Sequence, residues 1–183
     1  MLWIDQWKTC GKESGVNNLK LEKYENVILY LCSKLPEKAI QGKVKLAKLL
    51  YYVDFDRFEF NESMESVTGD GYRRLPMGPV PKSMTGVINS MSGKGLLEVT
   101  EEAQFAGRRN TTVFRAQASP DLSVFSPEDM AIIDRVVRKY LPLTGKQLQD
   151  LSHEEAPWLA VEHKDTIPLE LAFYRDTDFT DAA

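Results

Sequence analysis

The chain has 183 residues, 43% of them hydrophobic, which suits one domain with a sizeable core and leaves little room for a second. Its formal net charge of -4 disfavours a protein whose affinity comes mainly from neutralising phosphates, so we do not expect DNA as its partner. Cys10 and Cys32 are too few for a disulfide framework or a four-cysteine zinc site, which is typical of a reducing cytosol. No apolar run approaches the roughly 20 residues that span a bilayer. We therefore expect a cytoplasmic protein with no membrane partner.

Residues 1–18 are predicted to form an N-terminal arm and linker. Leu2, Trp3, Ile4 and Trp7 precede a stretch rich in Gly, Lys, Ser and Asn. The arm either folds back onto the domain or uses its two tryptophans to contact a partner, because tryptophan is enriched among interface anchors. Both alternatives stay open at this point.

Two long helices are predicted in the first third of the chain. Asn18 can cap a helix that runs to about Leu35, where a proline ends it. The second helix covers about residues 43–60 and places one carboxylate, Asp54, on its apolar side. An unpaired buried carboxylate is costly, so Asp54 needs a partner such as a Tyr hydroxyl, an Arg or His153. The alternative is a functional carboxylate in a cleft.

The segment from Val67 to Pro81 is predicted to be a rigid bend that is poor in backbone hydrogen bonds. It reads V-T-G-D-G-Y-R-R-L-P-M-G-P-V-P, in which prolines lack amide donors and glycines permit unusual backbone angles. Arg and Tyr side chains in a stiff loop suit a protein interface because little entropy is lost on docking. The predicted partner contacts in this bend are Tyr72, Arg73, Arg74, Pro76 and Met77. The bend could instead be a core element that only shapes the domain.

A short helix and a β-hairpin follow the bend. The helix is expected over residues 82 to about 91, and two strands around 97–100 and 114–116 flank a turn that contains Arg108 and Arg109. Three helices followed by a hairpin form a winged-helix outline, and the two arginines could then reach a phosphate backbone. A DNA-binding transcriptional regulator is therefore one alternative function, although likeness of shape does not establish DNA binding.

Two capped helices are predicted in the last third of the chain. Ser126 followed by a proline and two acids is a strong helix start, and the apolar stripe continues to Tyr140. Thr144 and Gln147 fit a capping box for a helix that runs to about His153.

The predicted elements define an α+β fold that is mainly α-helical, namely a compact helical domain with a small β-hairpin. We expect one domain over residues 19–175, followed by an acidic C-terminal tail, residues 176–183, that frays.

His153 with Glu154 and Glu155 is the one cluster that suggests acid-base or metal chemistry. A zinc or two-metal site would need a second ligand at facing helical spacing, and His163 is too far along the chain to be placed there by sequence. We expect His153 to be structural and to help seat Trp158, which should close the core. A metal-dependent hydrolase is a further alternative, but we assign no catalytic residue, metal or cofactor.

Three blocks of the sequence carry a resemblance to a known family. They are K-L-A-K-L-L-Y-Y-V-D-F-D-R-F (Lys45 to Phe58), the bend Val67 to Pro81, and L-S-H-E-E-A-P-W (Leu151 to Trp158). In this order the blocks resemble the Panacea domain of SocA-like antitoxins, once described as a phage-associated protein family. The resemblance spans about residues 20–165.

This resemblance implies a non-enzymatic antitoxin that binds and neutralises a cognate protein toxin. Antitoxin and toxin are normally encoded side by side, and members of the family pair with toxins of very different chemistry. Direct block of the toxin and delivery to a cellular protease are both compatible with the sequence. No separate helix-turn-helix domain is visible, which argues against promoter binding, and the oligomeric state is left open.

Overall fold

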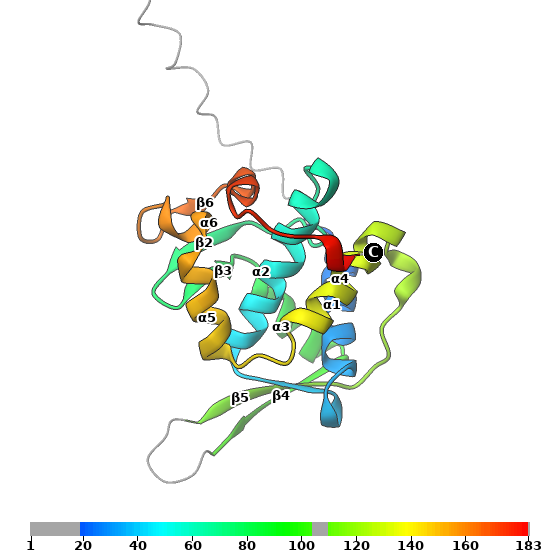
Figure 1. Ribbon diagram of the computed structural model, residues 1–183. Helices are drawn as coiled ribbons and strands as arrows, with labels where there is room; N and C mark the ends of the chain where they lie inside the picture. Colours follow the sequence, from blue (N-terminus) through cyan, green and yellow to red (C-terminus); the bar gives the residue numbers. More distant parts are fainter. Residues whose placement is uncertain (1–18, 104–109, 183) are drawn as a thin grey trace, which may run out of the picture.

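The computed structural model describes residues 19–103 and 110–182, so the predicted arm with Trp3 and Trp7 and the turn with Arg108 and Arg109 lie outside the described residues. The described chain is α+β and mainly helical, which confirms the predicted fold class (Figure 1). Its helices are α1 (Leu21–Ser33), α2 (Lys43–Glu59), α3 (Met84–Gly93), α4 (Pro127–Lys139), α5 (Gly145–Glu154) and α6 (Ala156–Leu159). Short 3-10 turns are η1 (Pro36–Lys38), η2 (Phe60–Glu62), η3 (Leu122–Val124), η4 (Leu169–Tyr174) and η5 (Thr180–Ala182). Within the described ranges, no helix is long and apolar enough to cross a membrane.

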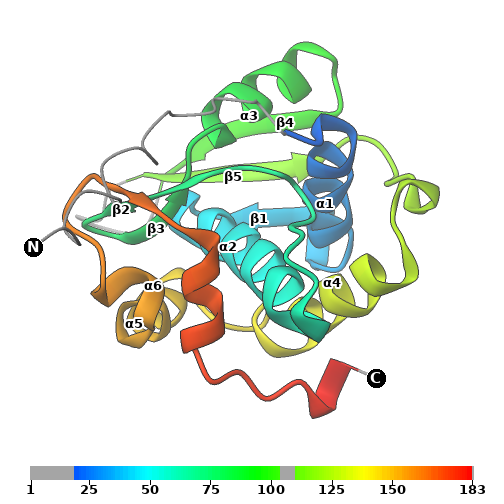
Figure 2. The same ribbon diagram turned by 90° about the horizontal axis from the view of Figure 1, so that it is seen from above.

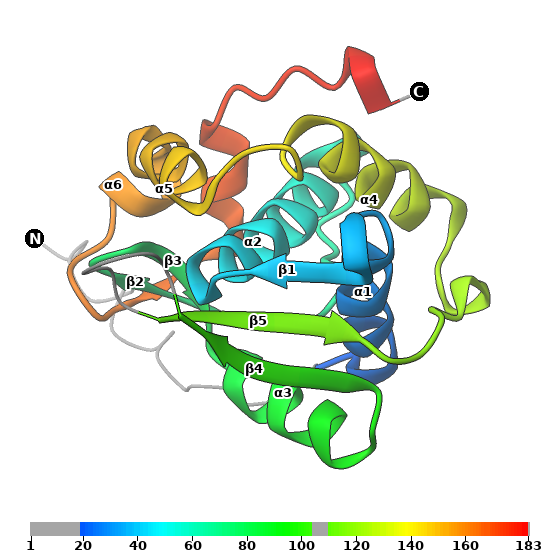
Figure 3. The same cartoon turned by 90° about the horizontal axis from the view of Figure 1, so that it is seen from below.

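Two three-stranded antiparallel sheets accompany the helices. The first has the order β1-β5-β4 and the second β3-β2-β6. Their strands are β1 (Ala39–Gln41), β2 (Tyr72–Leu75), β3 (Gly78–Pro81), β4 (Leu97–Glu102), β5 (Thr111–Ala116) and β6 (Thr166–Ile167). The β4–β5 pair confirms the predicted hairpin, whereas the second sheet is an addition that the sequence analysis did not predict. Figure 1 shows the first sheet beneath the helices, and Figure 3 views the face that no described helix covers.

Helix α2 lies at the centre of the fold. It contacts β1, β3, α4, α5 and η4, which surround it as Figure 3 shows. All its residues from 46 to 58 are buried, including Lys48, Asp54 and Asp56, so the prediction of a single apolar side is wrong for this helix. Partners on several sides cover it, and each buried charge must then be satisfied inside the protein.

Asp54 is satisfied by the segment that follows α2. Its carboxylate accepts hydrogen bonds from the amide of Thr68 at 2.8 Å, from the Thr68 hydroxyl, and from the Tyr72 hydroxyl at 2.7 Å. The Tyr72 hydroxyl also lies 2.9 Å from the carbonyl oxygen of Leu50. Burial raises the pKa of Asp54 to about 6, and these donors oppose the rise. A Tyr hydroxyl is thus among the partners of Asp54, as the sequence predicts.

The helix start predicted at Ser126 and the capping box predicted at Thr144 are both confirmed, and Ser126 forms a capping box as well. The Ser126 hydroxyl accepts from the amide of Asp129, and the Thr144 hydroxyl accepts from the amide of Gln147, with the reciprocal bonds also present. Helix α1 differs from its prediction because it begins at Leu21 without a side-chain cap, and Asn18 lies outside the described residues.

The acidic tail is not frayed in its described part. Arg135 of α4 donates from Nε to the Asp181 carboxylate at 2.6 Å and from a terminal nitrogen to the Asp178 carbonyl oxygen at 2.8 Å. The ring of Phe179 lies 4.8 Å from the centre of the Arg135 guanidinium group. The prediction of a frayed tail is therefore wrong for residues 176–182, because a buried arginine provides a binding site for the acidic segment.

The first prediction concerns the Tyr72 hydroxyl. Tyr72→Phe should lower the free energy of unfolding by about 1–3 kcal/mol, because the buried Asp54 carboxylate loses a donor without gaining water. Denaturation in urea measures the change. Tyr174→Phe is the matched control, since the Tyr174 side chain is 74% exposed and its variant should keep the wild-type stability. Equal stability of both variants would contradict a structural role for the Tyr72 hydroxyl.

Candidate partner-binding site

The three sequence blocks meet in one place. Helix α2, the β2–β3 hairpin and the α5–α6 segment contact one another, and Figure 2 shows α5 and α6 beside the hairpin with α2 on the inner side. Lys48 Nζ donates to the carbonyl oxygen of Pro79 at 2.7 Å, which ties α2 to the hairpin. The Tyr51 hydroxyl donates to Glu155 at 2.6 Å, which ties α2 to the start of α6. These bonds hold the hairpin in a defined position on the helical body.

Gly78 is required where the hairpin meets Lys48. Its φ of +100° is unfavourable for other residues, and a Cβ there would lie 2.3 Å from Lys48 Nζ and 2.9 Å from Ser152 Oγ. Lys48 is fully buried, and its Nζ is held by the carbonyl oxygen of Pro79. The glycine therefore permits α2, α5 and the first residue of β3 to approach one another closely.

Burial lowers the pKa of Lys48 to about 7, and the nearby carboxylate of Glu155 only partly opposes this shift. Burial also raises the pKa of Glu155, against the opposing effect of Arg175. The Arg175 guanidinium lies 5.7 Å from the ring centre of Tyr51 and pairs with the Asp56 carboxylate. A buried network of charges thus lies directly behind the hairpin.

An aromatic stack covers the outer side of this network. The rings of His153 and Trp158 are stacked with centres 4.0 Å apart, and the Arg74 guanidinium lies 4.0 Å from the Trp158 ring centre. Arg74 Nε also donates to the Trp158 carbonyl oxygen at 2.8 Å, and Trp158 Nε1 donates to the Leu75 carbonyl oxygen at 3.4 Å. The stack joins α5 and α6 to strand β2.

Of the two predictions for this stack, one is confirmed and the other is wrong. His153 does help seat Trp158, but its Nε2 is buried without a hydrogen-bond partner, and burial lowers its pKa. Trp158 is only partly buried and lies between His153 and Arg74, so the prediction that it closes the core is wrong. The neighbouring Pro157 is the residue that is fully packed.

The bend from Val67 to Pro81 is richer in hydrogen bonds than predicted. Residues 72–75 and 78–81 pair as antiparallel strands, and the turn between them contains Pro76 and Met77. The glycines and prolines therefore shape a hairpin, and the prediction of a bend poor in backbone hydrogen bonds is wrong. β6 adds a further strand on the other side of β2.

The structure separates the predicted contact residues of this hairpin into three groups. Tyr72 is fully buried in the core, so its side chain is not available to a partner. Arg74 is partly buried in the stack, and the alternation along β2 places Arg73 on the opposite face, where it is exposed. Pro76 and Met77 are exposed at the turn, with the Met77 side chain 48% exposed.

Several exposed apolar side chains near the hairpin were missed by sequence reasoning. Leu159 at the end of α6 is 60% exposed, and Leu151, Phe173 and Tyr174 are also exposed on α5 and η4, which contact α6. Neither α6 nor η4 has a helical period long enough to reveal which side faces solvent. We refer to Pro76, Met77, Trp158 and Leu159 as the hairpin surface.

The cluster that suggested metal chemistry does not form a metal centre: in the described part of the chain, no group of three or more His, Cys, Asp or Glu side chains could hold a metal ion. His153 stacks on Trp158, and Asp54 is occupied by Thr68 and Tyr72.

A family model described as the Panacea domain of antitoxin SocA-like proteins matches residues 46–159. This range is narrower than the resemblance over about residues 20–165, but it contains the central part of α2, the hairpin, and the α5–α6 segment as far as Leu159. No curated protein and no solved structure matches the chain significantly.

The second prediction concerns the buried lysine. Burial lowers the pKa of Lys48 to about 7 in the folded protein, whereas in the unfolded chain the pKa lies near the ordinary lysine value of 10.5. The unfolded chain binds more protons between these values, so the free energy of unfolding should rise with pH, by at most about 1.4 kcal/mol per pH unit. Lys48→Met should reduce this slope between about pH 7 and 8.5.

Urea denaturation at several pH values measures the slope. Lys94→Met, which removes an exposed lysine that pairs with Glu25, is the control and should keep the wild-type slope. A Lys48→Met variant with an unchanged slope would show that Lys48 keeps its charge in the folded protein.

Proposed function

The chain belongs to the SocA-like Panacea domain family, and from this premise we propose that it is an antitoxin that binds a cognate protein toxin and neutralises it by direct contact. The family model covers more than half of the chain and includes most of α2, the hairpin and the α5–α6 segment. The proposed partner is a protein encoded beside this one. The proposed role requires no catalysis and no cofactor.

The observation that carries the proposal is the position of the Pro76–Met77 turn. Bonds from the buried Lys48 and the stack of Arg74 on Trp158 hold the hairpin from two sides. The turn itself leaves the Met77 side chain 48% exposed. A rigid apolar end loses little conformational entropy when a partner covers it, which favours binding.

The side chains that could perform acid-base chemistry are hydrogen-bonded to other parts of the protein, which supports a binding role. Asp54 accepts hydrogen bonds from Thr68 and Tyr72, and Glu155 accepts one from Tyr51. Lys48 and both carboxylates are directed at other parts of the same protein, not at an open cleft. Their chemistry is used to hold segments of the chain together.

The contact residues that we propose are the hairpin surface together with Arg73. Arg73 makes no ion pair within the described residues and lies on the exposed face of β2, so it is available to a partner. Trp3 and Trp7 stay in the proposal as additional contacts. Tyr72 is withdrawn from it because its ring is buried.

The third prediction tests the hairpin surface. Met77→Glu places a charge at the turn without changing Pro76 or Gly78, so the fold should persist while the partner loses its apolar contact at the turn. Binding should weaken by several kcal/mol. The measurements are growth of cells that express the product of the adjacent reading frame, and calorimetric binding of the two purified proteins.

Met64→Glu is the matched control for this experiment. Met64 is also exposed, at 62%, but it follows η2 and lies outside the hairpin. The control should protect cells as well as the wild type does. Full protection by a folded Met77→Glu variant would move the interface away from the turn, and a neighbouring product that neither harms cells nor binds would contradict the antitoxin proposal.

A further inference from the structure

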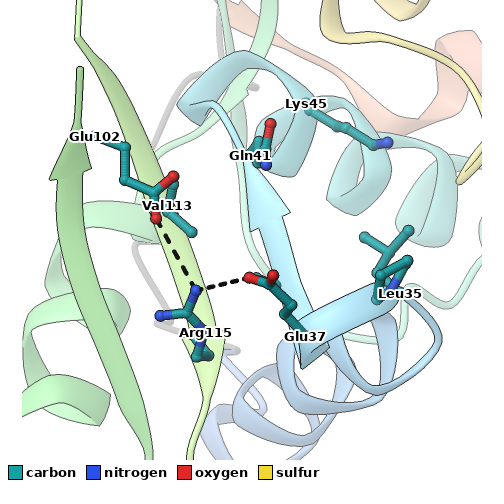
Figure 4. A pocket seen from close by; sticks show the side chains of 9 residues that line it. Leu35, Glu37, Gln41, Lys45, Glu102, Val113 and Arg115 are labelled. Atoms are coloured by element: carbon teal, nitrogen blue, oxygen red, sulfur yellow. Dashed lines mark hydrogen bonds and ion pairs between the residues drawn. The ribbon is translucent and has the colours of Figure 1, made fainter. Parts of the chain in front are cut away.

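Two hollows lie side by side near the start of α2, and both are lined by Gln41 and Lys45. The first has a volume of about 280 Å³ and lies between η1, β1 and β5 (Figure 4). Its arginine, Arg115, is paired with Glu37 at 3.1 Å and faces Glu102 at 3.9 Å, as the dashed lines of Figure 4 mark. The positive charge of Arg115 is therefore compensated by the protein itself.

The second hollow is larger and differs in its charge. It has a volume of about 590 Å³ and is formed by the first turns of α2 and α5, the adjoining ends of β4 and β5, and Met77 of the hairpin surface. We refer to it as the lysine cleft, after Lys43, Lys45 and Lys146 in its wall. Its volume falls within the range of about 300–1,000 Å³ that is usual for ligand pockets.

The lysines of this cleft are poorly compensated. Lys43 and Lys45 pair with no carboxylate in the described ranges, and Lys146 pairs only with Asp150 on its own helix, in an exposed contact of small energetic value. Glu101 is the acidic residue of the wall, and it accepts a hydrogen bond from the hydroxyl of Thr112 at 2.5 Å. A basic cleft thus stands out in a chain whose net charge is -4.

The backbone adds to this positive potential. Gly42 provides no capping side chain to α2, and neither α2 nor α5 has an acidic residue in its first turn. The two helix starts are in contact, because a Cβ on Gly145 would lie 3.3 Å from the amide nitrogen of Lys45. Partial burial lowers the pKa of Lys45, so the free protein leaves a cation incompletely solvated there.

We propose that the lysine cleft receives a segment of the partner that carries carboxylate side chains, while Met77 contacts an apolar side chain of the same segment. This inference rests on the proposed antitoxin function and specifies the chemistry of the partner. Two observations support it: two lysines in one cleft that pair with no carboxylate among the described residues, and continuity of this cleft with the hairpin surface through Met77.

Charge complementarity selects an acidic protein segment over nucleic acid. The cleft is a confined hollow rather than a long stripe, and Glu101 lies in its wall with Glu102 in the neighbouring hollow. A phosphate backbone would pass close to these carboxylates, whereas a short acidic segment can place its own carboxylates against Lys43 and Lys45.

The test compares two double variants that differ only in charge. Lys43→Gln with Lys45→Gln removes both charges, and Lys43→Arg with Lys45→Arg retains them. Binding to the purified product of the adjacent reading frame should weaken about tenfold or more in the Gln variant, with a smaller dependence on salt, and stay near wild type in the Arg variant. Circular dichroism confirms that both variants are folded.

A second measurement needs no toxin. Titration of the isotope-labelled protein with a hexaglutamate peptide should shift the amide resonances of Lys43, Val44, Lys45 and Lys146 in nuclear magnetic resonance spectra, and the Gln variant should lose these shifts. A 20-base-pair DNA duplex is the competing probe. Shifts of the same amides by the duplex and not by hexaglutamate would overturn the proposal in favour of nucleic acid.

The outcomes separate this inference from the antitoxin proposal. If the Gln variant binds the neighbouring product as tightly as wild type does, with the same salt dependence, the lysine cleft is not the docking site although the antitoxin proposal stands. If wild type does not bind that product, the antitoxin proposal fails, and the hexaglutamate titration decides whether the cleft binds acidic segments. Absence of shifts with hexaglutamate would overturn the inference about the cleft.

Discussion

The buried charges of α2 are the constraint on which the rest of the structure depends. Lys48, Asp54 and Asp56 lie on one helix, and none is exposed to solvent. An isolated charge inside a protein costs several kcal/mol, so each of them has to be met by a partner from elsewhere in the chain. The helix therefore organises the fold through its polar residues as well as through its apolar ones.

Each of these charges holds a different segment against α2. Lys48 binds the backbone of the hairpin, and Asp54 binds the segment that leads into it. Asp56 pairs with Arg135 and Arg175, and Arg135 in turn binds the acidic C-terminal segment. Removal of one partner from a buried ion pair such as that of Asp56 with Arg135 usually costs about 3–5 kcal/mol, so the ion pairs of Asp56 stabilise the present arrangement against alternatives.

The same arrangement leaves two neighbouring surfaces exposed, and these are the surfaces that we propose for the partner. The polar groups of the three family blocks are bound to one another, while Met77 remains exposed at the tip of the hairpin that they hold. The lysine cleft begins beside that methionine, where two helix starts meet. An apolar contact next to uncompensated positive charge is a combination that can give both affinity and selectivity for an acidic partner.

The sequence by itself determined the local features and the family. Ser126 and Thr144 identified two helix starts because capping requires only residues within one turn, and alternation revealed the β4–β5 hairpin for the same reason. The need of Asp54 for a partner also followed from its place among apolar residues of its helix.

Tertiary structure alone decided that Tyr72 is buried, that Arg73 and Arg74 lie apart, and that lysines from α2 and α5 line one cleft. These facts depend on contacts between segments distant in sequence, and residue spacing along the chain does not encode which faces such segments present to one another.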